Sequence, residues 1–383
     1  MIDWENISTI IFIVVLGILV WIDRKNIEFK YGIFIRKMKK GKEWIYAVGN
    51  KYKTFFGYFG TIAAVVGIIS SLVAFYFIAS QAYGIITNPK VTAPGLRPII
   101  PSVPSTVACT YALCVPFWFW IIGVLVVLIS HELSHAFVSR AANIRIKSFG
   151  LISVLVLPGA FVEPDERQLK KSSSFTKLKI YAAGSFANLL VFAIASLITT
   201  AMFNSLYISS GVQFEGLVAN SPAEQVSLKG TIQQINNVQI KSVQDFENFI
   251  TKISPGAVLK IKTTEGNFTL TTITNPDDAT KAFVGISRAS TAFHVAENYA
   301  SFSGGIDWIF QLFAWLVFLN FGIGLVNLLP IKPLDGGLMY EEIIKIIFGK
   351  AKPNYVKALS IFTFLLIIIN IIGPYIPQLV ALT

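Results

Sequence analysis

Long apolar segments recur along this chain of 383 residues, and they constrain its fold more than any other feature. A helix needs about 20 mostly apolar residues to cross the hydrocarbon core of a bilayer. Only 14% of the residues are charged, against roughly 25% in soluble globular domains, which excludes an ordinary cytosolic enzyme. The candidate spans are residues 7–22, 55–80, 116–140, 178–202, 306–329 and 358–379. The sequence therefore predicts a multi-pass integral protein of the cell membrane.

Basic residues gather in the loops on one side of these spans. Residues 23–54 hold ten Lys and Arg and three acidic residues, whereas residues 81–115 hold two basic ones. Because Lys and Arg are enriched in cytoplasmic loops, we expect residues 23–54 inside and both termini outside. The same asymmetry explains the net charge of +11, so nucleic acid is not an expected partner.

Residues 211–290 have a different pattern, in which apolar and polar residues alternate as in half-buried strands. Asn236-Asn237 and Glu265-Gly266 are typical of tight turns, and residues 243–251 indicate a short amphipathic helix. We therefore expect an inserted α+β domain, and the topology places it outside the cell.

The segment 148–164, SFGLISVLVLPGAFVEP, is apolar but too short and too interrupted by Gly and Pro to span a membrane. Its β-branched run before Pro158-Gly159 favours a β-hairpin that dips into the membrane from the cytoplasmic side. Non-helical backbone survives at that depth only where protein or a water-filled cavity satisfies it. The alternative is a surface loop with a hydrophobic contact to the core.

The two cysteines, Cys109 and Cys114, lie in a Pro-rich loop. They are too few for a structural zinc site of four thiolates. A local disulfide is expected if the loop faces an oxidising space, and two free thiols are the alternative.

The third span contains the motif His131-Glu132-Leu-Ser-His135. On a helix, positions i and i+4 share a face, so both imidazoles can bind one Zn²⁺ with Glu132 beside them as general base. The metal would lower the pKa of its bound water to about 7. Ionisable groups inside a membrane helix are costly and usually functional, which disfavours the alternative of a structural histidine pair.

A catalytic zinc ion needs a third protein ligand. His294, the remaining histidine, follows the predicted outer domain and is more easily read as an ordinary exposed residue. We expect a carboxylate on the cytoplasmic side, and Asp335 is the best candidate because two prolines and two glycines break the chain around it. Glu341 and Glu342 are expected on the solvated face of an amphipathic helix. The rivals of Asp335 are Glu163, Asp165, Glu341 and Glu342.

Together, HELSH and the later NLLPIKPLDGG resemble the site-2 protease family of intramembrane zinc metalloproteases. The segment Gly184-Ser-Phe-Ala-Asn188 is similar to a glycine-to-asparagine pattern of that family, and the hairpin lies where the family has a membrane-embedded β segment. The inserted domain resembles a PDZ domain in its Ser221-Pro-Ala-Glu224 stretch. The resemblance implies that His131, His135 and Asp335 bind one zinc ion and that Glu132 is the catalytic base.

The apolar segments and the resemblance together predict the architecture, although the resemblance does not specify the first two spans or the basic loop. We expect an all-α polytopic membrane protein with about six transmembrane helices, a membrane-embedded β-hairpin and an extracytoplasmic PDZ-like α+β domain. We expect an N-terminal region (1–115), the first part of the core (116–205), the PDZ-like domain (206–292) and the second part of the core (293–383). The zinc site is expected toward the cytoplasm.

The expected activity is hydrolysis of transmembrane segments of substrate proteins within the bilayer, as in regulated intramembrane proteolysis. Asn188 and Asn327 would hydrogen-bond the extended substrate or its oxyanion, and helix–helix hydrogen bonds are the alternative. The hairpin edge around Val154 and Leu155 would pair with the unwound substrate. Two other activities are open: a membrane zinc peptidase for soluble peptides, and a non-catalytic relative that binds membrane proteins.

Two features depart from the family pattern. Lys332 stands where an apolar residue or proline is expected, and it either reaches the membrane interface or contacts substrate. The PDZ-like segment lacks an aspartate after Lys229-Gly230, so its domain is expected to act as a size filter or in packing as readily as in binding peptide ends.

Overall fold

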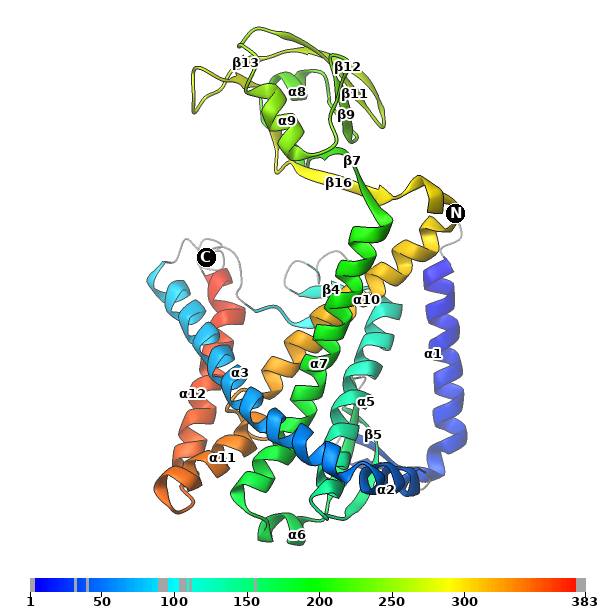
Figure 1. Cartoon of the computed structure of the whole chain (residues 1–383), viewed down its shortest axis with the longest axis vertical. Helices are drawn as coiled ribbons and strands as arrows, with labels where there is room; N and C mark the ends of the chain where they lie inside the picture. Colours follow the sequence, from blue (N-terminus) through cyan, green and yellow to red (C-terminus); the bar gives the residue numbers. More distant parts are fainter. Residues whose placement is uncertain are drawn as a thin grey trace. The chain divides into compact units, whose positions relative to one another are not determined.

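The computed structural model describes residues 4–30, 33–38, 41–88, 96–102, 109, 112–154 and 157–376 (Figure 1). Among these residues, six helices are long and apolar enough to cross a membrane. They are α1 (Trp4–Asp23), α3 (Lys53–Thr87), α5 (Phe117–Ala141), α7 (Ser174–Leu206), α10 (Ser303–Asn327) and α12 (Pro353–Ile372). The six predicted apolar helices are therefore confirmed. The chain divides into two compact units, Met1–Leu197 with Gln311–Thr383, and Ile198–Phe310.

Small residues let the helices of the first unit approach each other closely. Gly67 of α3 faces Ala182 of α7, and a Cβ atom built on Gly67 would lie 3.0 Å from the methyl group of Ala182. Ala63 and Ala64 are buried in the same cluster. Without a hydrophobic driving force between helices in lipid, such close backbone packing is a main source of their association.

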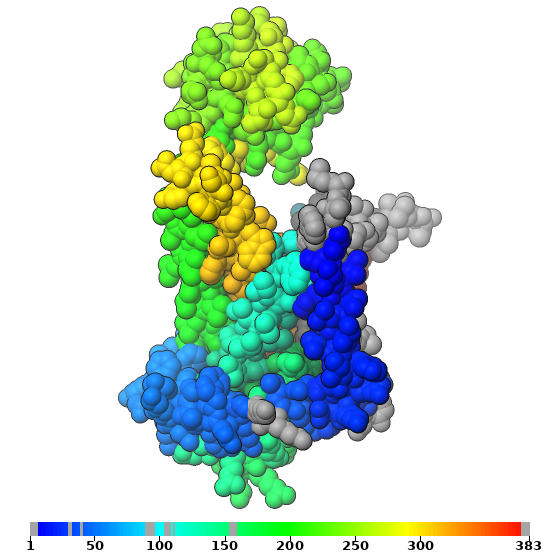
Figure 2. All heavy atoms as spheres, turned by 90° about the vertical axis from the view of Figure 1, so that its right-hand side faces the viewer, coloured from blue at the N-terminus to red at the C-terminus, as the bar shows by residue number. Residues whose placement is uncertain are grey.

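The α1 helix lies at the periphery of this unit (Figure 2). No residue in its most apolar window is buried. Its described ring contacts join Phe12 to Phe117 and Trp118 of α5. An apolar helix that is exposed on nearly all sides fits a lipid environment.

A four-stranded antiparallel sheet also belongs to this unit. Its strands, in spatial order, are β1 (Ile27–Lys30), β2 (Ile33–Lys37), β5 (Ile146–Val154) and β6 (Leu157–Pro164). The predicted hairpin is therefore present as β5 and β6, but β1 and β2 come from the basic segment that the sequence indicated only as a loop. In consequence β5 is an inner strand, and β1 and β6 are the edges.

The hairpin reverses earlier than its sequence suggested. Pro158 and Gly159 lie inside β6, opposite Ser153 and Ile152, so the turn precedes them. Residues 155 and 156, and with them the predicted substrate contact Leu155, are outside the described residues.

Short elements complete the first unit. They are η1 (Arg24–Asn26), α2 (Lys42–Lys51), β3 (Ile99–Pro101), β4 (Leu113–Val115), α6 (Glu166–Lys171), α11 (Asp335–Phe348) and η3 (Gly373–Tyr375). The α2 helix packs on α5, where the guanidinium of Arg140 lies 4.1 Å from the ring centre of Tyr46.

A disulfide joins Cys109 to Cys114, which decides between the two alternatives that the sequence left open.

The second unit contains the predicted α+β domain. Its main sheet has the order β12 (Gly266–Thr271), β11 (Val258–Thr263), β9 (Ile232–Ile235), β7 (Tyr207–Gln213) and β16 (Ser290–Val295), and β10 (Val238–Gln239) pairs with β9. The remaining elements are β8 (Gly216–Leu217), α8 (Pro222–Gln225), α9 (Val243–Ile250), β13 (Ile273–Thr274), β14 (Ala282–Phe283), β15 (Ile286–Ser287) and η2 (Glu297–Phe302). The last strand, β16, extends to Val295, which is three residues past the predicted boundary at residue 292.

Local sequence patterns in this unit predict its helix and two of its turns, one of them shifted by one residue. Asn236 and Asn237 both have positive φ and form the turn between β9 and β10. The second predicted turn lies one residue earlier than expected, because Gly266 already pairs with Thr263. The predicted amphipathic helix is α9, and a capping box of Ser242 and Asp245 fixes its start.

Candidate metal centre

Two helices bring three potential metal ligands together. His131 and His135 occupy adjacent turns of α5, and Asp335 is the first residue of α11. The two imidazole Nε2 atoms lie 3.1 Å apart. Asp335 Oδ2 lies 3.1 Å from Nε2 of His131 and 3.2 Å from Nε2 of His135. The structure therefore assembles the trio expected from the sequence, across about 200 residues of chain.

This triangle of donor atoms fits one zinc ion. Zinc binds imidazole nitrogen and carboxylate oxygen at about 2.0–2.2 Å, so ligand atoms in a tetrahedral site lie roughly 3.3–3.5 Å apart. The three observed separations are only slightly shorter. Among the described residues, Asp335 Oδ2 is buried without a hydrogen-bond partner. An unpaired buried oxygen is costly, and a bound cation would remove that cost.

The α7 helix leaves room for the ion through Gly184. A Cβ atom built on Gly184 would collide with Nε2 of His135 and lie 2.7 Å from ring carbons of His131. Any larger residue here would occupy the space between the imidazoles and α7. The sequence singled out the segment that begins with Gly184, but not this reason for glycine.

The same helix orients the histidine rings. His135 Nδ1 lies 2.6 Å from the carbonyl oxygen of Ile180, so Nδ1 carries the proton and Nε2 keeps its lone pair for metal. This contact was invisible to sequence reasoning because a backbone carbonyl has no residue signature.

Asn188 completes the support of His131. Its fully buried amide lies 3.2 Å from His131 Nδ1 and 2.9 Å from Ser130 Oγ. With metal on Nε2, His131 Nδ1 is a donor, and a half-turn of the Asn188 amide presents its oxygen to that proton and its NH₂ to Ser130. The described contacts of Asn188 are thus the helix–helix alternative; its contact with substrate stays a prediction.

The segment after α10 directs Asp335 toward the imidazoles. Ser71 Oγ of α3 donates a 2.6 Å hydrogen bond to the carbonyl of Leu328, and Leu328 is fully buried. A Cβ atom on Gly336 would collide with that same carbonyl. The glycine therefore permits the tight fold-back that starts α11.

The rival carboxylates have other partners. Asp165 caps α6 by accepting from the backbone N–H groups of Arg167 and Gln168, and Glu163 accepts from Ser148. Glu341 forms an ion pair with Lys332.

The expectation of a solvated Glu342 is wrong. Only 6% of this residue is exposed, and its Oε1 lies 2.8 Å from Lys177 Nζ.

The remaining predicted site residues that the structure describes are Glu132, Asn327 and Val154. Glu132 is half-buried on α5 beside the two histidines, and its carboxylate interacts with the backbone of Val162 in β6. Asn327 is the last residue of α10 and is half-buried. Val154 ends β5 and pairs with both Ile33 and Leu157, so its backbone is not at a sheet edge.

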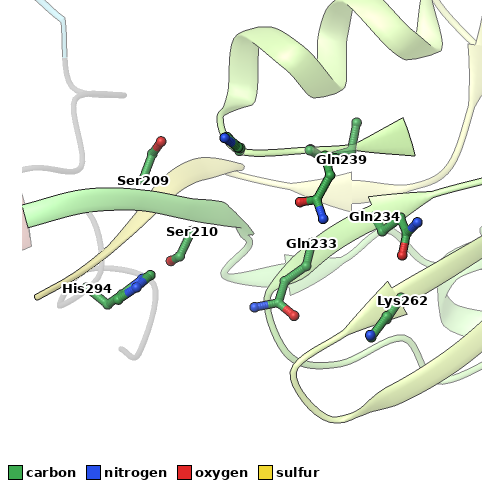
Figure 3. A pocket seen from close by; sticks show the side chains of 9 residues that line it. Ser209, Ser210, Gln233, Gln234, Gln239, Lys262 and His294 are labelled. Carbon is green, nitrogen blue, oxygen red and sulfur yellow. The ribbon is translucent and has the colours of Figure 1, made fainter. Parts of the chain in front are cut away.

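His294 is not part of this trio; it lies on β16 of the α+β unit and is exposed, as the sequence predicted. It lines a polar cavity of about 260 Å³ (Figure 3). Besides His294 of β16, the cavity is lined by residues of four other strands and of the segment that follows β10: Ser209, Ser210, Gln233, Gln234, Gln239, Ile240, Lys241 and Lys262. They include no carboxylate or thiol, so the cavity is a poor metal site.

Comparison with known proteins agrees with this geometry. The profile of "Peptidase family M50" matches residues 119–371. An uncharacterised protein of Methanocaldococcus jannaschii is 28% identical over 86% of this chain and 85% of its own length. A protein of Clostridium acetobutylicum, named as a candidate zinc metalloprotease, is 23% identical over 65% of this chain and 93% of its own length.

A further protein of Clostridium perfringens with the same descriptive name is 22% identical over 63% of this chain and 91% of its own length. The matched residues include the whole donor trio. The metal cofactor of the chain is accordingly Zn²⁺, for which two imidazoles and one carboxylate are a suitable donor set.

The space at Gly184 generates a first prediction. We expect Gly184→Ala to lower the zinc content of the purified protein from about one ion per chain to less than about a tenth, because the new methyl group displaces the His135 ring. Metal analysis of the full-length protein in detergent measures this directly.

Gly57→Ala in α3 is the matched control, since a Cβ atom there meets nothing within 4 Å. It should keep the zinc of the parent. A Gly184→Ala protein with full zinc content would contradict the assigned role of this glycine.

Proposed function

The chain belongs to peptidase family M50, and on this basis we propose that it is an intramembrane zinc endopeptidase that cleaves transmembrane segments of other proteins. The observation that carries the proposal is the convergence of His131, His135 and Asp335 beside Glu132. A carboxylate next to a zinc site with three protein ligands is the arrangement of hydrolytic zinc enzymes. The surrounding apolar helices favour substrates that reach the site from the lipid.

The proposed roles divide between the metal and the protein. Zinc supplies Lewis acidity, which makes water nucleophilic near neutral pH. The carboxylate of Glu132 takes the proton of the attacking water and returns it to the leaving amine, as general base and then general acid. Ile180 and Asn188 hold the two imidazoles in the tautomer that faces the metal.

A substrate helix must unwind before it can be cut, because its amides are satisfied within the helix. An unwound segment can recover hydrogen bonds by adding to the edge of a sheet. The four-stranded sheet has two edge strands, β1 and β6, and β6 is the one whose Val162 interacts with Glu132. We therefore propose β6 as the substrate-pairing strand in place of the inner strand at Val154. Asn327 remains a proposed contact to the substrate backbone.

The proposed orientation puts the zinc centre toward the cytoplasm and the α+β unit outside. The basic segment 23–54 supports the first part. The disulfide between Cys109 and Cys114 supports an outer position for the loop 81–115, because disulfides persist in oxidising compartments. The predicted topology puts the α+β unit on the same side of the membrane as that loop. The α+β unit is proposed to be PDZ-like and to act as a size filter or as a site for peptide ends.

The role of Glu132 leads to the second prediction. Glu132→Gln should retain zinc and lose cleavage of a membrane-helix substrate by about 10²–10⁴-fold, because the amide cannot take up a proton. Asp335→Asn should instead lose zinc, since it replaces a ligand. Cleavage and metal content are measured on the same purified proteins.

The substrate class is tested in the same assay. If parent protein cuts a soluble peptide of the same sequence as fast as the membrane helix, it is a peptidase for soluble peptides. If zinc-loaded parent cuts neither, it is a non-catalytic relative.

A third prediction concerns the β6 edge. Ala160 lies two residues from Val162, so its backbone N–H points to the same side of the strand, away from β5. Ala160→Pro removes that donor and should slow cleavage of a fully helical substrate about tenfold or more.

A substrate with a Gly-Pro pair already breaking its helix at the cut site is the matched control, and it should be slowed much less. Equal slowing of both substrates would argue against strand pairing as the step that unwinds the helix.

A further inference from the structure

A buried ion pair lies away from the metal trio and takes no part in the chemistry. It joins Lys177 of α7 to Glu342 of α11 at 2.8 Å, and the two residues are 7% and 6% exposed. Burial alone would raise the pKa of Glu342, but hydrogen bonds from Lys177 and Ser174 outweigh it and lower that pKa. Two cations lie beside the Glu342 carboxylate, Lys177 Nζ at 2.8 Å and Lys345 Nζ at 3.9 Å, and the Lys177–Glu342 contact is almost closed to solvent.

The spacing of the pair matches the spacing of the metal centre. Asp335 and Glu342 are seven residues apart on α11, and Lys177 and Gly184 are seven residues apart on α7. Seven residues are two helical turns with a drift of only about 20°. Each helix therefore carries one member of the ion pair on the same face as its contribution to the zinc site, two turns away.

Besides this ion pair, α11 contacts its neighbours through apolar groups and through a few polar ones, such as Tyr340 with Ser71 of α3. Met339, on the same face between Asp335 and Glu342, is fully buried in a cluster with Ala182 and Leu328. Apolar packing of this kind tolerates small shifts before stability is lost. A shift of α11 along α7 that separated Lys177 Nζ from the Glu342 carboxylate would leave two buried charges without partners, which is costly.

We propose that Lys177 and Glu342 are positioning residues, which lock the register of α11 against α7 so that the carboxylate of Asp335 meets the two imidazoles. The α7 helix then acts as one frame for the whole centre. It holds Glu342 through Lys177, His135 through Ile180, and His131 through Asn188.

This role predicts that the ion pair affects zinc retention and the unfolding temperature differently. Buried ion pairs often add little to stability because desolvation offsets their attraction, whereas they can specify one arrangement. The pair should therefore matter for how tightly zinc is held, and much less for the unfolding temperature. The inference rests on the proposed ligand set of the centre, and not on the identity of the substrate.

The test uses full-length, zinc-loaded protein in detergent. Zinc release into excess chelator and the unfolding temperature are measured without any substrate. In Lys177→Met/Glu342→Met we expect zinc release to be about tenfold faster or more, the size of effect typical for outer contacts of metal ligands. The unfolding temperature should be unchanged or higher. The reversed pair, Lys177→Glu/Glu342→Lys, should return the release rate to within about threefold of the parent.

Asn370→Leu is the matched control, because it removes a buried hydrogen bond from Asn370 to the carbonyl of Ile78 that joins α12 to α3. It should lower the unfolding temperature and leave zinc release unchanged. Parent-like zinc release in the Met/Met variant would overturn the proposal. The proposal would also be overturned if zinc release became faster only in step with a fall in unfolding temperature, in Asn370→Leu and in the pair variants alike. Because no cleavage is measured, either result leaves the protease assignment untouched.

Discussion

The free-energy cost of burying ionisable groups governs this structure. Two imidazoles and a carboxylate meet among apolar helices, where each would be expensive if left alone. Their donor atoms lie 3.1–3.2 Å apart with no hydrogen bond to satisfy Asp335 Oδ2 among the described groups. A bound zinc ion would make that arrangement favourable, and the helices around the three donors leave room for it. The glycine at position 184 is the clearest sign, because its missing side chain leaves room beside both rings.

The α7 helix organises the centre although it supplies no ligand. Over three turns it presents a cation to Glu342, a carbonyl to His135, an open space at Gly184 and an amide to His131. These are different kinds of contact at successive positions of one rigid element. Rigid supporting shells of this kind decide how well a metal site is preorganised. A helix without a ligand can thus be as important to the centre as the helices that carry the donors.

The four-stranded sheet shows which strand pairings a local sequence pattern can predict and which it cannot. A β-branched run and the following Pro158-Gly159 were enough to predict a hairpin, and β5 and β6 are its strands. They could not reveal that β2 covers β5, because strand partners 110 or more residues apart leave no mark in the local sequence. That long-range pairing covers β5 and leaves β6 as the edge next to Glu132. It therefore changes which residues are proposed to meet the substrate.

By itself, the sequence determined the apolar helices, the α+β insertion and the pair of histidines with their glutamate. These follow from spacing along one element, where helical or strand periodicity fixes which side chains share a face. Only the tertiary structure decided how Asp335 reaches the histidines and why position 184 is glycine. It also decided that Glu342 is buried against Lys177 and not solvated. Such contacts depend on how separate helices pack, and residues 165 positions apart become neighbours only when the chain has folded.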